Sequence, residues 1–171
     1  FFAASCLAEV SAVPALVSDA DPAGTNLRAA PSGDVLAVLP FSAGPRIVRV
    51  RESKKGWFRV QPFPIEEDEI EGASTVPAGG WMHGSVLALC ACASEDGDPG
   101  LYAAPRWNAD SDIKVPEGTP LRPLERKGEW LKVRTSQNGK SVERWVNEQQ
   151  VTPSPNDLIE CQARIVKSWK K

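Results

Sequence analysis

The most reactive side chains in the sequence are those of four cysteines and one histidine. Cys90 and Cys92 follow His83 closely, and a thiol activated by an imidazole is the nucleophile of many hydrolases. Such a pair also needs a third group that orients the imidazole, and residues this close along one predicted strand seldom converge with one. The sequence therefore predicts a protein that is not an enzyme and has no catalytic residues.

The cysteine pattern favours disulfides over a metal site. The four cysteines are Cys6, Cys90, Cys92 and Cys161; none has Cys-x-x-Cys spacing, and a single histidine cannot complete a zinc set. A bridge between Cys90 and Cys92 is awkward, because alternate residues of a strand lie near the upper distance limit. We expect each flanking cysteine to pair with one central cysteine, with no metal and no cofactor. Disulfides also favour an extracytoplasmic location, in the periplasm or secreted.

The first eight residues could be the tail of a secretion signal, but no basic region leads them, so we expect a processed or truncated chain. Ala3-Ala4-Ser5-Cys6 faintly resembles a lipoprotein processing site. The usual leucine three residues before the cysteine is missing, which disfavours a lipid on Cys6.

Composition narrows the class of protein. Thirteen glycines and fifteen prolines in 171 residues favour an all-β fold, because proline removes a backbone donor and glycine raises the entropic cost of ordering a helix. The net charge of −2 and the lack of a long apolar run argue against nucleic acid as a partner and against a membrane span. An acidic run over 66–71 lacks the alternating ligands of a calcium loop, so a solvated loop is favoured.

An internal repeat organises the chain. Leu27-Arg28-Ala29-Ala30-Pro31 aligns with Leu101-Tyr102-Ala103-Ala104-Pro105, Gly56-Trp57 with Gly128-Glu129-Trp130, and Trp81-Met82 with Trp145-Val146. We place the copies at residues 22–89 and 95–153, after an N-terminal extension (1–21) and before a C-terminal segment (154–171). Each copy is short enough that a closed barrel is an economical way to remove sheet edges.

Local patterns fit this plan. In the stretch after Gly56, alternation puts Phe58 and Val60 on a core face and Trp57 on the other face. Asn138-Gly139 predicts a two-residue hairpin turn, because both residues tolerate positive φ. A short C-terminal helix is predicted from the spacing of Leu158, Cys161, Ile165 and Trp169.

These landmarks resemble two tandem bacterial SH3 (SH3b) domains. The family's opening is similar to Asn26-Leu27-Arg28-Ala29-Ala30-Pro31, its central strand to Gly56-Trp57-Phe58-Arg59-Val60, and its closing strand to Gly80-Trp81-Met82. The second copy departs from the pattern at Tyr102, where arginine is usual, and at Arg144, where glycine is usual. The resemblance covers about 130 residues and implies two SH3-like β-barrels that recognise cell-wall peptides or protein segments.

Aromatic residues are the candidate ligand contacts. Tyr102, Trp107, Trp57 and Trp130, with Arg28, could line a groove for an extended peptide, or the rings could instead cap the barrels. For Trp81 and Trp145, core packing is favoured. We expect a non-catalytic exported module that binds peptidoglycan stem peptides or another extended peptide. The alternatives are an envelope scaffold protein and, less favoured, a cell-wall hydrolase.

Overall fold

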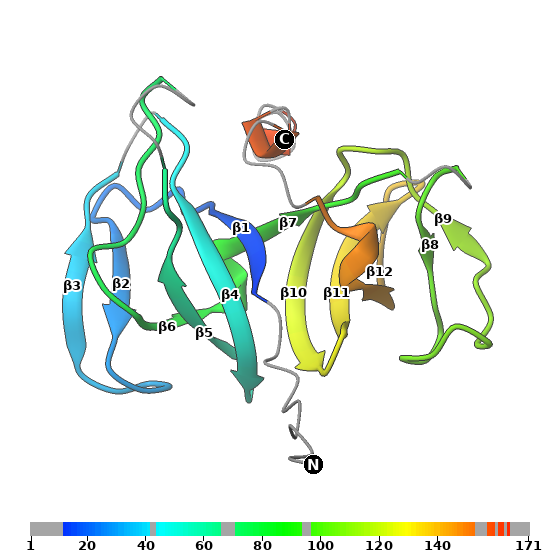
Figure 1. Ribbon diagram of the computed structural model, residues 1–171, viewed down its shortest axis with the longest axis horizontal. Helices are drawn as coiled ribbons and strands as arrows, with labels where there is room; N and C mark the ends of the chain where they lie inside the picture. The colour runs from blue at the N-terminus through cyan, green and yellow to red at the C-terminus, as the bar shows by residue number, and fades with distance from the viewer. Residues whose placement is uncertain are drawn as a thin grey trace, which may run out of the picture.

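Antiparallel strands dominate the computed structural model, which describes residues 12–41, 44–65, 71–93, 97–152, 157–159, 161, 162 and 164. Ten strands form one sheet in the order β12-β11-β10-β7-β1-β4-β5-β6-β2-β3, and β8 pairs with β9 (Figure 1). The all-β prediction is confirmed. The strands are β1 Val13–Val17, β2 Thr25–Arg28, β3 Val35–Leu39, β4 Ile47–Lys54, β5 Trp57–Pro62, β6 Gly80–His83, β7 Leu87–Cys90, β8 Gly100–Leu101, β9 Ile113–Lys114, β10 Pro120–Lys127, β11 Trp130–Gln137 and β12 Lys140–Asn147.

The same strand register occurs twice in the sheet. Phe58 pairs with Met82 and Arg59 with Trp81; at the equivalent places Leu131 pairs with Val146 and Lys132 with Trp145. Each closing strand then leads into a short 3₁₀ helix, η1 (Gly84–Val86) or η2 (Glu148–Gln150). The side chains of His83 and Asn147 accept a backbone N–H at the start of these helices. The repeat found in the sequence is therefore also a repeat of backbone pairing.

Strand β7 belongs to both repeats, which the sequence did not predict. Leu16 and Val17 of β1 pair with Ala88 and Leu87, while Leu89 and Cys90 of β7 pair with β10. Ala91 then bridges to Val151, just as Val17 pairs with Leu87. Residues 13–17 thus occupy in the first repeat the place of residues 87–91 in the second. We call residues 13–87 the first half and residues 87–151 the second half.

The predicted N-terminal extension contains this first strand. The sequence predicts that residues 1–21 lie outside the repeats, yet Val13, Ala15 and Leu16 of β1 are buried between β4 and β7. Alternating residues of the central strands fill one continuous core; among its largest members are Leu27, Phe58, Met82, Leu101 and Leu131. As predicted, Phe58 and Val60 are buried and Trp57 lies on the other face.

Polar contacts and a close backbone approach join the two halves. Arg126 of β10 donates from its backbone N–H to Ser53 Oγ, and its Nη1 donates to the Val50 carbonyl at 3.1 Å. Gly84 lies so close to Pro123 that a Cβ at this position would stand 2.1 Å from the proline carbonyl oxygen. This approach requires glycine. The halves are therefore packed against each other rather than separated by a linker.

The C-terminal segment is helical where it is described, over 157–159, 161, 162 and 164. Leu158 and Cys161 are buried on one face, as their spacing predicts, against Leu16, Ala88 and Cys90 on the outer side of β1 and β7. Ile165 and Trp169 lie outside the described residues. Figure 1 shows this segment above β7, between the two halves.

The structure contains one of the two expected disulfides. Cys90 is bonded to Cys161, which is one of the pairings between a central and a flanking cysteine. Cys92 is a free thiol, so the structure does not contain the second predicted bridge, and Cys6 lies outside the described residues. Most of the acidic run, residues 66–70, also lies outside them.

Two further predictions can be compared with the structure. Asn138 and Gly139 have φ values of 50° and 75° and form the two-residue turn between β11 and β12, as expected. Trp145 is buried, but Trp81 is only half-buried, so core packing was the wrong expectation for Trp81. Within the described ranges, no helix is long and apolar enough to cross a membrane.

Candidate ligand-binding surfaces

Three of the predicted contact residues form one aromatic cluster in the second half. The ring centroids of Tyr102 and Trp107 are 5.6 Å apart, those of Tyr102 and Trp130 5.3 Å, and those of Trp107 and Trp130 4.9 Å. All three pairs meet edge to face, with interplanar angles of 88°, 82° and 63°. This geometry is favoured by the quadrupoles of aromatic rings. We call these three residues the second-half aromatic cluster.

Different elements bring the three rings together. Trp130 begins β11 after a turn in which Gly128 has φ of 58°, and Tyr102 is placed by its backbone bridge to Trp145. Trp107 comes from the loop between β8 and β9 and is 53% exposed, whereas Trp130 beneath it is only 8% exposed. Trp107 therefore presents the accessible ring of the cluster, and its own loop covers Trp130.

The same loop also lines a surface hollow. The hollow has a volume of about 500 Å³ and is lined by Ala103, Asp110, Ser111, Asp112 and Arg144. Arg144 Nε lies 3.7 Å from Asp112 Oδ1. The equivalent of Arg144 in the first half is Gly80, where a Cβ would stand 2.7 Å from Leu27 Cδ1. The arginine thus occupies a position where the first half closes tightly, and it lies against the loop at Asp112.

The first half carries a second surface at the equivalent positions. Arg28 lies over the Trp57 ring, 5.9 Å from its centroid, and its Nη1 donates to the Gly33 carbonyl at 2.8 Å. His83 meets the edge of the Trp57 ring at a centroid distance of 5.3 Å. Trp57 is half-buried and, unlike Trp130, has no ring from a long loop over it among its described contacts. This surface is therefore more open than its counterpart.

The five predicted contact residues thus form two groups, one in each half of the sheet. Arg28 and Trp57 form one group, and the second-half aromatic cluster forms the other. Sequence reasoning missed the contributions of His83 and Trp81 to the first surface. Period-two alternation could have found both, because they flank the buried Met82 on β6 and must face outward.

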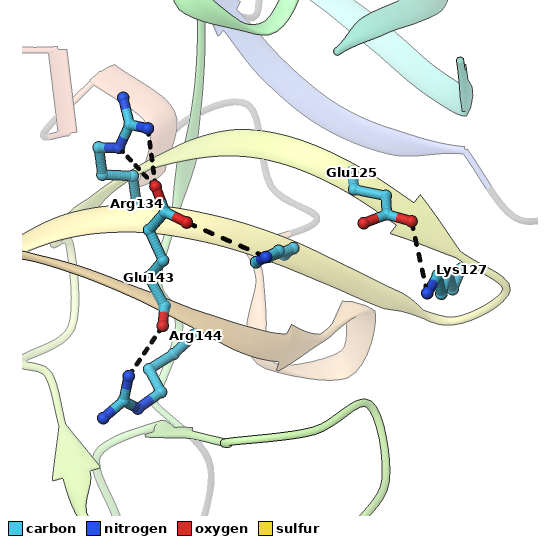
Figure 2. A network of polar contacts seen from close by, with 6 residues as sticks. Glu125, Lys127, Arg134, Glu143 and Arg144 are labelled. Atoms are coloured by element: carbon cyan, nitrogen blue, oxygen red, sulfur yellow. Dashed lines mark hydrogen bonds and ion pairs between the residues drawn. The ribbon is translucent and has the colours of Figure 1, made fainter. Parts of the chain in front are cut away.

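A network of charges lies on β11 and β12 of the second half (Figure 2). Arg134 Nη2 donates to Glu143 Oε1 at 2.7 Å, and Lys132 Nζ lies 4.0 Å from Glu143 Oε2. The hydrogen bond from Arg134, together with the positive charges of Arg134 and Lys132, lowers the pKa of Glu143. Lys127 lies over the Trp145 ring, 5.4 Å from its centroid. The charged side chains of Lys132, Arg134 and Glu143 are half-exposed or exposed, so each ion pair stabilises the fold only weakly.

The reactive residues named at the outset do not form a catalytic arrangement in the described part of the chain. Cys90 is held in its disulfide, and His83 contacts Trp57 and Ser85. Burial, followed by the negative charges of Glu117 and Asp157, raises the pKa of the Cys92 thiol and so disfavours the nucleophilic thiolate. Over the described ranges, no three His, Cys, Asp or Glu side chains gather as a metal site would require.

Comparisons with known proteins leave the family open. No protein-family model matches the chain, and no curated protein matches it. The structure of NlpC1 from Trichomonas vaginalis is similar over 86% of this chain and 48% of that chain, with 10% identity and a TM-score of 0.33. NlpC2 from the same organism is similar over 85% and 49%, with 11% identity and a TM-score of 0.30. The chain spans about half the length of these two structures, and at such TM-scores the likeness carries no functional argument.

Proposed function

We propose that this protein is a non-catalytic binding module that recognises an extended peptide-like ligand through the second-half aromatic cluster. The observation that carries the proposal is Trp107. Its side chain is 53% exposed, on a loop that is longer than the equivalent loop between β2 and β3 of the first half, so Trp107 is not a core residue. Exposed indoles supply contact area with little entropy loss and one polar atom for orientation, as peptide-binding grooves require.

The repeated register supports a further part of this proposal, that the two halves are tandem SH3-like barrels. Each half has a hairpin strand that pairs with its closing strand, at Arg28–Trp81 and at Tyr102–Trp145, and a bulged strand pair before its central tryptophan. The resemblance to SH3b domains then suggests peptidoglycan stem peptides as ligand. The Cys90–Cys161 disulfide favours an extracytoplasmic location, where such a bond persists.

Retention on purified peptidoglycan tests the proposal. The wild-type chain should sediment with peptidoglycan sacculi, and Trp107→Ala should abolish most of this retention, because it removes the accessible ring. Phe41→Ala is the matched control, since Phe41 is an exposed aromatic residue of the first half that lies outside the cluster. Retention that survives Trp107→Ala, or that Phe41→Ala reduces equally, contradicts the proposal. Trp130→Ala is less informative alone, because Trp130 is nearly buried and its loss also disturbs packing.

A second candidate function is that of a scaffold in the cell envelope. The contacts of Arg126 and Gly84 across the halves favour this alternative, since they fix two potential partner surfaces in one orientation. If the wild-type chain is not retained on peptidoglycan, the scaffold is the better account. Peptidoglycan cleavage by the purified chain would instead favour a hydrolase.

A further inference from the structure

The first half leaves an apolar edge uncovered. Val35, Leu36 and Val38 are 45%, 56% and 56% exposed, and all three lie on β3, the last strand of the ten-stranded sheet. Single exposed apolar side chains are ordinary, but three on one terminal strand are typical of a contact surface. No charged residue interrupts this strand.

A row of side chains continues this edge across the sheet. Val35 is opposite Arg28, Arg28 is opposite Trp81, and Trp81 is opposite Arg59, so the four residues lie on the neighbouring strands β3, β2, β6 and β5. Directly opposite residues of antiparallel strands share a face, and the adjacent residues Leu27, Met82 and Phe58 fill the core. The row therefore faces outward and spans roughly 14 Å. We call it the first-half row.

The second half shows what covers such a row. There the equivalent residues are Tyr102, Trp145 and Lys132, and Trp145 is only 7% exposed, with Lys127 over its ring. The long loop that carries Trp107 packs on the adjoining Trp130. In the first half, the chain between β2 and β3 is short, and both Trp57 and Trp81 remain half-exposed. The first-half row thus lacks a cover that the second half supplies from its own chain.

The charge of the surrounding residues indicates what kind of segment would cover the first-half row. Residues 26–61 hold seven arginines and lysines against Asp34 and Glu52. In the row, Arg28 and Arg59 lie opposite Trp81 on its two neighbouring strands, and the Arg28 guanidinium lies over the Trp57 ring. Arg59 Nε lies 2.8 Å from Glu52 Oε1, so it already takes a carboxylate partner at a half-exposed site.

We infer that the first-half row is a docking surface for an acidic segment of a partner protein that carries one aromatic or aliphatic anchor residue. The anchor packs on Trp81 and Val35, and flanking carboxylates pair with Arg28 and Arg59. Four side chains in a row of this length offer far less surface than the roughly 800 Å² that each partner buries in a stable dimer. The row therefore suits a segment better than a second copy of the chain. The inference does not rest on the proposed cell-wall ligand.

A labelled peptide tests the inference. The probe is an eight-residue fluorescein-labelled peptide of glutamates around one phenylalanine, titrated with the whole chain and followed by fluorescence anisotropy. Arg59→Gln should weaken binding about fivefold, the scale of one partly exposed charge pair. Glu52→Gln should strengthen it, because it frees the Arg59 guanidinium for the ligand. Lys132→Gln, at the equivalent second-half position, is the matched control and should change the affinity less than twofold.

The outcomes separate the inference from its alternatives. Weaker binding by Val35→Ser, with Trp107→Ala binding the peptide normally, supports a site distinct from the second-half aromatic cluster. Equal loss with Lys132→Gln, or no loss with Arg59→Gln, overturns the inference. Equal affinity for a glutamate peptide without phenylalanine overturns it as well, as does tighter binding to duplex DNA or to phosphatidylserine vesicles. Self-association that is lost with Val35→Ser would show a second copy as the occupant and would also overturn it.

Discussion

The Cys90–Cys161 disulfide offers the sharpest test of how the C-terminal segment is held. The two cysteines are 71 residues apart in the sequence, and their bond closes a loop that includes most of the second half. In the chain-entropy account, a loop of this length lowers the entropy of the unfolded chain enough to stabilise the fold by about 4 kcal/mol. The double variant Cys90→Ala/Cys161→Ala should therefore lose about 4 kcal/mol of unfolding free energy.

Guanidinium unfolding followed by tryptophan fluorescence measures this loss. Cys92→Ala is the matched control, because Cys92 is a free thiol two residues from Cys90, and it should change the unfolding free energy by less than about 1 kcal/mol. Dithiothreitol should destabilise the wild-type chain as much as the double variant and leave that variant unchanged. A loss below about 1 kcal/mol in the double variant would refute the entropy argument. Peptide mapping without reductant shows independently whether Cys90 and Cys161 are linked.

Three further predictions concern the junction and the free thiol. Arg126→Met should cost about 3–5 kcal/mol of unfolding free energy, measured in urea, because the buried guanidinium bonds to the Val50 carbonyl and forms an ion pair with Glu148. Gly84→Ala should lower the thermal midpoint by several degrees in calorimetry, since its Cβ would collide with the backbone of β10. Cys92 should react with iodoacetamide more slowly than a cysteine of the unfolded chain at pH 8, and its rate profile should be displaced to higher pH, because its pKa is raised.

Each of these has a result that would contradict it. Arg134→Met removes an exposed arginine that also pairs with a glutamate, and it should cost less than about 1 kcal/mol of unfolding free energy. An equal loss in the two variants would show that burial adds no stability to the contacts of Arg126. An unchanged midpoint for Gly84→Ala would mean that η1 and β10 separate easily. Cys92 alkylation as fast as in urea would show that burial and the neighbouring carboxylates do not suppress its thiolate.

Alternation and turn chemistry were enough to predict the strands that fill the core. Phe58 and Val60 could be placed correctly because they alternate with Trp57, Arg59 and Gln61, and the hairpin at Asn138-Gly139 because both residues tolerate positive φ. Strand β1 could not be matched to β7 in the same way. Val13-Pro14-Ala15-Leu16-Val17 and Leu87-Ala88-Leu89-Cys90-Ala91 share no residue at any equivalent position, since a buried central strand needs only apolar side chains of suitable size. The start of the repeat was therefore invisible in the sequence.

The candidate surfaces were predictable by residue type but not by accessibility. Trp57 and Trp130 occupy the same register, and nothing in their local sequence shows that one is half-exposed and the other nearly buried. The difference comes from the loop between β8 and β9, which carries Trp107 over Trp130 and lines a hollow together with Arg144, the residue at the position of Gly80. The half that has arginine in place of this glycine is thus also the half with the longer loop, the hollow and the covered indole. The two halves share one backbone plan, and their loops give them different surfaces.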